Sequence, residues 1–392
     1  MVLDKKKLII LSLVFYLLSA VGSYFIFKSG GQAAIVEPTT PTVVPNASSG
    51  FKVDPSLPKD QACPLNGQMY TKPEKDIWSQ RRPLTVMIEN HEDSRPQSGI
   101  SSSDVVYEAV AEGGITRFLV IFYCGAVAQD VQVGPVRSAR TYFMDFASEY
   151  GGKPLYAHVG GANTPGPANA LGQIEDYGWA GVNDLNQFSI GFPTFWRDYD
   201  RLGREVATEH TMYSSTEKLW VYAAKNRGLT NVDKKGVSWD ENFVPYTFKD
   251  DATNLPTSLT ATFNFWDRYA AYLVTWTYDK TTNSFKRTNG GSAHLDKNND
   301  QQLTAKNVVF LYMVESNAND GYENNAHLLY KTKGTGPADI LIDGKMVKAK
   351  WQKKDRTSRL TLTDANTGTE IKFNKGRIWF EIVPSDTDVN IQ

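Results

Sequence analysis

Compact apolar runs, separated by polar or glycine-rich turns, recur between residues 81 and 229. They are rich in valine, isoleucine, leucine and phenylalanine, a composition typical of buried strands. The predicted strands cover residues 84–88, 105–110, 118–123, 131–133 and 155–159. Helix signals alternate with these runs, which predicts an α/β domain.

The helices of this domain are predicted from their capping residues and glycine stops. Ser138 is the predicted N-cap of a helix at 142–150 that stops at Gly151 and Gly152. Ser214 and Glu217 fit a capping box, which opens a helix that runs to residue 227. A further helix is predicted at 168–177, and the aromatic, glycine-rich residues 179–199 are expected to form a surface loop.

From residue 259 onward almost every segment has the pattern of a strand. Residues 273–278 alternate apolar and polar side chains, and residues 308–314 form a long apolar run. Asp343 and Gly344 separate two further runs, a strong signal for a two-residue hairpin. We therefore expect an α/β N-terminal domain at 81–229, a polar linker at 230–258 and an all-β C-terminal domain at 259–392, α+β overall.

The N-terminus carries an uncharged run at residues 8–27, preceded by three lysines and closed by Lys28. This run is long enough to cross a bilayer as a helix. A cleavable signal peptide would have a shorter apolar region and a better small-x-small site than Ser19-Ala20-Val21. The pattern favours an uncleaved signal anchor at 1–28, single-pass in the cell membrane, with a cytoplasmic N-terminus and both domains extracytoplasmic.

Residues 29–80 are rich in proline, threonine and serine, and they predict a flexible extracytoplasmic linker. Near its end lies Cys63, one of only two cysteines in the chain. The pair Cys63 and Cys124 matches no metal pattern. Either the two form one disulfide outside the cytoplasm, or Cys124 is a buried free thiol.

Composition narrows the classes of function. A content of 41% hydrophobic and 22% charged residues is that of a folded protein, which excludes disorder throughout. The net charge of -1 gives no general basic field, and no groove-reading motif is present, so we expect no nucleic-acid partner.

Polar elbows that contain arginine and glycine follow or interrupt the apolar runs, at residues 90–99, 112–117 and 134–140. Strand ends are where α/β sheets commonly hold ligands. The planar fork of arginine suits phosphate or carboxylate, so the expected ligand is anionic. The predicted ligand-binding residues are Asn90, His91, Arg95, Gln97, Gly113, Gly114, Thr116, Arg117, Arg137, Ser138 and Arg140. Alternatively, the arginines pair with nearby carboxylates such as Glu108 and Asp145 and only fix the loops.

Glu108 and Glu112 with Asp104 could supply a general acid and base or hold a hard divalent cation. The catalytic candidates are Glu112 and Asp104 from this set, and His210 as a hydrogen-bonded site histidine. A paired structural carboxylate is the alternative for both acids. His91, His158 and His210 could together form an open zinc site, but their spacing matches no helix motif, so we assign no metal ligands. Ser138 lacks a Gly-x-Ser-x-Gly elbow, which favours capping over nucleophilic attack. The sequence does not define a cofactor.

Several of these strings together resemble a known family. Ile88-Glu89-Asn90-His91, Glu112 through Arg117 and Gly134 through Arg140 are similar to motifs of the YerB-like lipoproteins, and so are residues 290–296, 303–308 and 379–384. The resemblance implies a bacterial cell-envelope protein of unknown function with an N-terminal α/β and a C-terminal β-rich domain. Two features depart from the family: no lipid-attachment cysteine follows the apolar run, and the family's proline-histidine-asparagine is Glu209-His210-Thr211 here.

A looser likeness is to the LytR-CpsA-Psr glycopolymer transferases. Asp104-Val105-Val106 and Gly134-Pro135-Val136-Arg137 resemble two of their strand motifs, but Ser138 stands where those enzymes have a metal-associated aspartate.

Two functional hypotheses follow. The first is an envelope protein that binds an anionic glycan, lipid phosphate or carboxylate, with a cell-wall glycan or a polyprenyl phosphate as candidate ligand. The second is a cell-wall polymer hydrolase or glycopolymer transferase that uses Glu112 or Asp104 with Arg117 and Arg137.

Overall fold

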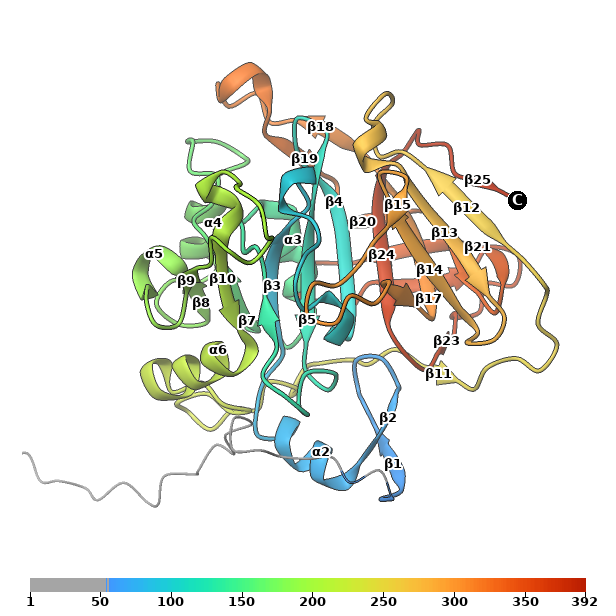
Figure 1. The fold of residues 1–392 in the computed structure, drawn as a ribbon, viewed down its shortest axis with the longest axis horizontal. Coiled ribbons are helices and arrows are strands. Elements are labelled where there is room, and N and C mark those ends of the chain that lie inside the picture. The colour runs from blue at the N-terminus through green and yellow to red at the C-terminus, as the bar shows by residue number, and fades with distance from the viewer. Residues whose placement is uncertain (1–53, 55) are drawn as a thin grey trace, which may run out of the picture. The chain divides into compact units, whose positions relative to one another are not determined.

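The computed structural model describes residue 54 and residues 56–392 of the chain (Figure 1). The predicted anchor at 1–28 and the first part of the predicted linker lie outside these residues. Within the described part, no helix has the length and apolar character needed to cross a membrane.

A mixed ten-stranded sheet runs through the whole described region. Its strand order is β22-β21-β20-β17-β24-β4-β5-β3-β7-β8, so strands from both ends of the sequence lie side by side (Figure 1). The bounds are β3 (Leu84–Glu89), β4 (Val105–Glu112), β5 (Ile115–Phe122), β7 (Leu155–His158), β8 (Asp184–Asn186), β17 (Asn307–Met313), β20 (Gly334–Ile342), β21 (Lys345–Lys353), β22 (Thr361–Asp364) and β24 (Ile378–Pro384). Strand-rich halves with few helices agree with the predicted α/β plus β fold.

The two halves of the chain meet where β24 pairs in parallel with β4. Ile378 lies opposite Val105, and Glu381 lies opposite Glu108. Because side chains alternate along a strand, Trp379 and Glu381 point to one face of the sheet and Phe380 points to the other. The sheet is therefore continuous across the boundary between the predicted domains.

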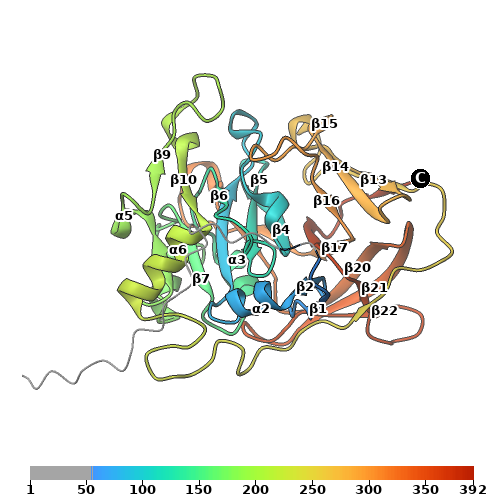
Figure 2. The ribbon, with the colours of Figure 1, turned by 60° about the horizontal axis from the view of Figure 1, so that its bottom comes forward.

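A second sheet covers one face of this seam. Figure 2 shows it as a separate layer beside β17, β20 and β21. Trp276 of this sheet packs edge-on against Trp379, with ring centroids 5.3 Å apart. Its strands are β12 (Thr260–Phe263), β13 (Val274–Asp279), β14 (Ser284–Asn289), β15 (Ser292–Ala293), β16 (Thr304–Ala305) and β25 (Asn390–Ile391).

Short helices pack against the N-terminal half of the large sheet. Phe146 of α3 stacks on Tyr107 of β4 with a centroid distance of 4.9 Å, and the Tyr142 hydroxyl donates to the carbonyl of Val110. The helices are α2 (Lys72–Trp78), α3 (Thr141–Ala147), α4 (Ala170–Asp176), α5 (Gln187–Ile190) and α6 (Thr216–Tyr222), which continues as one π-helical turn at Ala223–Arg227.

Small strand pairs complete the fold. A three-stranded sheet joins β6 (Gln132–Val133), β10 (Met212–Ser215) and β9 (Trp196–Arg197). The pairs are β1 (Lys59–Ala62) with β2 (Met69–Thr71), β11 (Phe248–Lys249) with β23 (Phe373–Asn374), and β18 (Glu315–Asn317) with β19 (Leu328–Tyr330).

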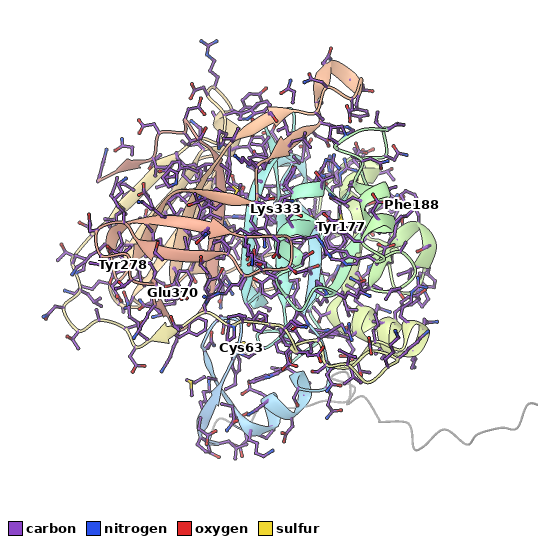
Figure 3. All side chains as sticks on the ribbon, turned by 180° about the vertical axis from the view of Figure 1, so that it is seen from behind. Cys63, Tyr177, Phe188, Tyr278, Lys333 and Glu370 are labelled. Atoms are coloured by element: carbon purple, nitrogen blue, oxygen red, sulfur yellow. A yellow bond between two sulfur atoms is a disulfide. The ribbon has the colours of Figure 1, made fainter. Side chains whose placement is uncertain are left out.

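The last part of the predicted linker is folded, so the upper bound of 80 is wrong. The chain forms β1, β2 and α2 between residues 59 and 78. Glu74 accepts from the backbone and hydroxyl of Thr71 at the start of α2, and Trp78 is buried. Cys63 forms a disulfide with Cys124, which ties this segment to the end of β5 (Figure 3). Composition alone hid these tertiary contacts.

Local predictions need correction at three places. Arg140, not Ser138, precedes α3, and Ser138 offers its carbonyl to Arg117 instead. The N-cap of α6 is Ser215, because the hydroxyl of Ser214 donates to a carbonyl across the sheet. Residues 179–199 are not only a surface loop: Trp179 is fully buried, and β8 extends the large sheet.

Candidate functional site

The three predicted elbows come together at one end of the large sheet. Glu89, the last residue of β3, lies opposite Arg117 of β5. The segment 134–140 runs beside β3, since the backbone N–H of Arg137 donates to the carbonyl of Met87. Glu112 ends β4 in the same region. Strand pairing thus gathers residues that are distant in sequence.

The turn between β4 and β5 requires its glycines. Gly113 and Gly114 have φ of 56° and 80°, a region that L side chains rarely adopt. A Cβ on Gly114 would lie 2.4 Å from the ring of Tyr269. These two predicted site residues therefore shape the turn.

A pocket of about 230 Å³ opens between these elements. Its walls come from the end of β4, the segment 137–140, the loop after β7 and a loop of the C-terminal half. The lining residues are Glu112, Arg137, Ser138, Arg140, Gly161, Ala162, Asn163, Tyr322 and His327. His327 is held by Asp320, 2.7 Å from its Nδ1, and by the stacked ring of Tyr322.

Glu112 is clamped by two buried arginines. Its Oε1 lies 3.4 Å from Nη2 of Arg117, and its Oε2 accepts a short bond from Arg140. Burial alone would raise the pKa of Glu112, but the charges of Arg140 and Arg117 outweigh it and lower the pKa to about 2. The carboxylate is therefore ionised at neutral pH.

Arg140 and Arg137 repel Arg117 even though Glu112 pairs with two of these arginines. Burial, followed by the charge of Arg140, lowers the pKa of Arg117 to about 10. Arg137 contributes to the same effect. Positive charge is thus only partly balanced at the pocket.

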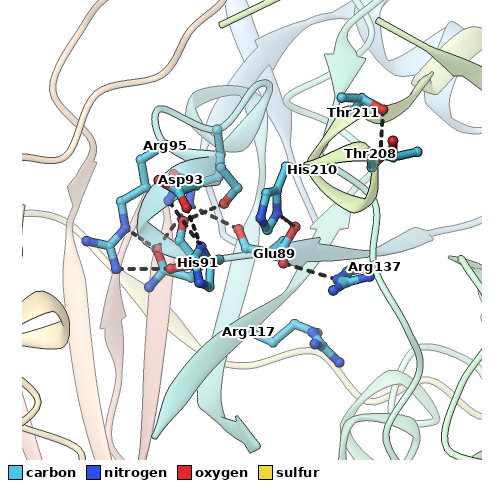
Figure 4. A network of polar contacts seen from close by, with 12 residues as sticks. Glu89, His91, Asp93, Arg95, Arg117, Arg137, Thr208, His210 and Thr211 are labelled. Atoms are coloured by element: carbon cyan, nitrogen blue, oxygen red, sulfur yellow. Dashed lines mark hydrogen bonds and ion pairs between the residues drawn. The ribbon is translucent and has the colours of Figure 1, made fainter. Parts of the chain in front are cut away.

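A second carboxylate, Glu89, links a histidine to the third arginine (Figure 4). Nε of Arg137 lies 3.1 Å from Oε1 of Glu89, and Nδ1 of His210 lies 2.9 Å from Oε2. The hydrogen bond that His210 donates to Glu89 raises the pKa of His210, and burial opposes this only in part. The imidazole is oriented by a buried acid, as in many catalytic and metal sites.

The ring of His210 stacks on the ring of His91, with centroids 4.8 Å apart and planes within 18°. Asp93 follows in the 3-10 turn Glu92–Ser94, and its Oδ2 lies 3.7 Å from Nδ1 of His91. The three side chains lie on the far side of Glu89 from Arg137 (Figure 4).

Four of the predicted ligand residues belong instead to a buried network between the two halves. Asn90 donates to Thr116 and accepts from Gln97, and Thr116 donates to Glu108. Arg95 bonds the carbonyl of Ala271 and lies over the ring of Tyr272. These side chains connect the N-terminal half to the six-stranded sheet.

Asp104 is also placed away from the pocket. It is fully buried before the first residue of β4, where it accepts the N–H groups of Tyr123 and Cys124 and the amide of Asn66. Burial, opposed by these donors, raises the pKa of Asp104 to about 7. Glu112 lies at the other end of the same eight-residue strand, roughly 26 Å away at about 3.3 Å per residue.

His158 does not join His91 and His210. Its Nε2 lies 2.5 Å from Asp184 and its Nδ1 2.6 Å from the carbonyl of Gly160, and the ring is fully buried. The predicted set of three histidines is thus reduced to two.

Sequence reasoning missed several residues that line or order the site. Glu89 directly follows the predicted strand at 84–88 and precedes the candidate Asn90, and that position was an available signal. Asn163, Tyr322 and His327 reach the pocket from loops without a periodic pattern, and His327 comes from the other half of the chain. No local signal in the sequence identifies them.

The fold and this strand-end pocket define a two-domain protein, with an α/β half and a β-rich half on one shared sheet. Residues 67–230 match the N-terminal domain, and residues 261–380 the C-terminal domain, of a family described as "Protein of unknown function (DUF3048)". The chain belongs to the DUF3048 family.

Comparison with individual proteins confirms the YerB-like resemblance. The chain is 27% identical over 333 residues to the "Putative lipoprotein YerB" of Bacillus subtilis (strain 168), covering 84% of this chain and 88% of that protein. The crystal structure of YerB protein from Bacillus subtilis superposes with a TM-score of 0.66 at 23% identity, covering 84% of this chain and all of that one. The latter likeness shows the fold.

Proposed function

We propose that this protein is a cell-envelope protein that binds an anionic group, a phosphate or carboxylate of an envelope glycan or lipid, in the pocket beside Arg137. The observation that carries the proposal is the gathering of Arg117, Arg137 and Arg140 around one pocket at the ends of sheet strands. Arginine forks match the geometry of phosphate and carboxylate oxygens.

Charge balance supports an anion. The three guanidinium groups are paired with two carboxylates, Glu89 and Glu112, which leaves one positive charge before His210 is counted. Protonation of His210, whose pKa is raised, would add a second. An anion would therefore be bound with little repulsion from the acids that are already clamped.

Arg137 is the arginine that a ligand would reach first. Its side chain is 26% exposed, whereas those of Arg117 and Arg140 are 2% and 6% exposed. Ser138 and Asn163 line the same pocket and offer uncharged donors. Arg117 and Arg140 would attract the ligand through their charge, and Arg137 would contact it directly.

The location follows from the relative and the N-terminal sequence. YerB carries the name of a lipoprotein, which associates that protein with the membrane. In this chain the uncharged run at 8–27 would replace a lipid anchor, with the N-terminus cytoplasmic and both domains outside. The Cys63–Cys124 disulfide fits an oxidising compartment.

The alternative hydrolase or transferase reaction receives less support. Asp104 and Glu112 lie at opposite ends of β4, too far apart to act on one substrate bond. With a pKa of about 2, Glu112 is also a poor proton donor at neutral pH.

Binding to soluble anionic cell-wall fragments and to a polyprenyl phosphate in micelles tests the proposal. We expect saturable binding by the full-length protein, with Arg137→Ala weakening it at least about tenfold, the loss of a charge-assisted hydrogen bond. Lys354→Ala removes one exposed charge from the C-terminal half and serves as the control. Equal binding by wild type and Arg137→Ala would refute the proposal, and the two probes separate a glycan from a lipid source.

A further inference from the structure

Beyond the anion pocket, we propose that His91, Asp93 and His210 form a binding site for one divalent transition metal ion of the zinc class. One ligand atom from each of the three residues lies within 4.8 Å of the other two. The set joins two imidazoles and one carboxylate, a donor combination found in catalytic zinc sites and in other open metal sites.

The turn that carries His91 and Asp93 is fixed by its own hydrogen bonds. Ser94 donates both its N–H and its hydroxyl to the carbonyl of His91. The guanidinium of Arg204 donates to the carbonyl of Asp93. Backbone anchoring of this kind holds two ligands in place without using their metal-binding atoms.

The two imidazoles present different nitrogens to an ion. The Nδ1–H of His210 donates to Glu89, which leaves the lone pair of its Nε2 free, and no hydrogen bond among the described residues engages that atom. Nδ1 of His91 accepts the backbone N–H of Asp93, so the lone pair of this ring is at Nδ1, 3.7 Å from Oδ2 of Asp93. A bound ion would take that lone pair in place of the Asp93 N–H.

Glu89 gives His210 the environment of a metal ligand. It is 3% exposed, and its two oxygens are divided between His210 and Arg137 (Figure 4). A carboxylate that orients a metal-binding histidine in this way is a recurrent outer partner of metal sites, and it increases the basicity of the ring.

The donor set selects the class of ion. Mg²⁺ and Ca²⁺ prefer oxygen ligands, whereas imidazole favours zinc and its neighbours. Three protein ligands leave a coordination position open for water or a substrate. The side chains of His91 and Asp93 are 29% and 62% exposed, so an ion can enter from solvent.

A bound metal ion would draw the ligand atoms of His91, Asp93 and His210 closer together. In a tetrahedral site with bonds of about 2.05 Å the ligand atoms lie about 3.4 Å apart. The stacked ring of His91 therefore has to turn toward His210, which its partial exposure permits. His210 and Glu89 are buried and would stay in place.

The test is titration of the full-length protein, purified in detergent and stripped with chelator, with Zn²⁺ alone. We expect saturable one-to-one binding by calorimetry, a rise in unfolding temperature, and no binding of Mg²⁺ at the same concentration. His91→Gln and Asp93→Asn should each weaken Zn²⁺ binding by more than about 100-fold, because the loss of an outer partner alone costs about 10- to 100-fold. Glu89→Gln should fall in that lower range.

Glu92→Gln is the matched control, since it alters an exposed carboxylate in the same turn that is outside the ligand set. His91 and Asp93 are accessible side chains, so their variants should fold, and the metal-free unfolding temperature checks this. The proposal is overturned if wild type shows no saturable Zn²⁺ binding, or if both ligand variants bind like Glu92→Gln. No anionic ligand is present, so failure of the anion proposal leaves this result unaffected.

Discussion

Two networks of carboxylates and arginines lie on the same large sheet and differ in access to solvent. In the buried network, Arg287 of β14 meets Glu108 of β4 and Glu381 of β24, and all three side chains are fully buried. In the pocket network, Glu89 and Glu112 face arginines near a solvent-accessible cavity. The same residue types thus join two halves of a fold in one place and form a candidate binding site in the other.

The buried network follows from strand register. Glu108 and Glu381 are direct neighbours on paired strands, an arrangement that repels when both are ionised. Arg287 donates to Glu108 at 2.5 Å, while burial and then the charge of Glu108 raise the pKa of Glu381 well above its usual value. The seam therefore holds one close ion pair, Arg287 with Glu108, and a second acid whose ionisation is opposed by burial and by Glu108.

Arg287→Met should have the largest effect, because it leaves the fully buried side chain of Glu108 without its ion-pair partner. Loss of one member of a buried ion pair costs about 3–5 kcal/mol, which urea unfolding at pH 7 measures. Lys286→Met is the matched control on the same strand: its pair with Asp279 is solvent-exposed and is worth less than about 1 kcal/mol. Equal losses of unfolding free energy in the two variants would show that burial does not make the Arg287 pair more important than an exposed pair.

Glu112→Gln should come second, with a loss of about 2–3 kcal/mol at pH 7. The folded pKa of about 2 lies below the unfolded value, so this contribution is complete above about pH 4.5 and is lost as pH falls toward 2. Urea unfolding of wild type and variant should therefore differ at pH 7 and converge near pH 2. A pH-independent difference would contradict the electrostatic origin.

Arg137→Ala should destabilise by only about 1 kcal/mol or less, because its side chain is partly exposed and Glu89 keeps its bond to His210. Thermal unfolding measures this, beside the binding loss described above. A loss of stability as large as that of Arg287→Met would show that Arg137 has a structural role, like the arginine of the buried network.

Glu381→Gln should have the smallest effect, within about 1 kcal/mol, because burial and Glu108 already oppose ionisation of this acid. Glu108→Gln is its counterpart and should cost more, since it removes the partner of Arg287. If the two substitutions proved equally costly in urea unfolding, Arg287 would not distinguish the two acids.

The sequence predicted most strands of this fold because their signal is local. Residues 84–88, 105–110 and 118–123 carry compact apolar runs, and Asp343-Gly344 marks its hairpin, where both residues have positive φ. The disulfide that ties down the segment at 59–78 was one of the two alternatives for the cysteines, but the strands and helix of this segment were not predicted, because composition gives no signal for packing with distant residues.

The candidate site was harder to predict because its partners are remote in sequence. Glu89 and His210 are 121 positions apart, and Arg287 and Glu108 are 179 apart. Glycine and arginine signals located the elbows but could not separate Arg137, which faces the pocket, from Arg95, which joins the halves. Only the pairing of strands assigns each arginine to its network.

The pairing of β24 with β4 also has a consequence for biogenesis. Until residues 378–384 have emerged and docked, the N-terminal half has an open strand edge at β4, whose backbone groups can pair with other chains. Synthesis runs from the N-terminus, so this edge stays unpaired until nearly all of the described residues have been made. Docking of β24 is therefore the step that closes the large sheet against pairing with other chains.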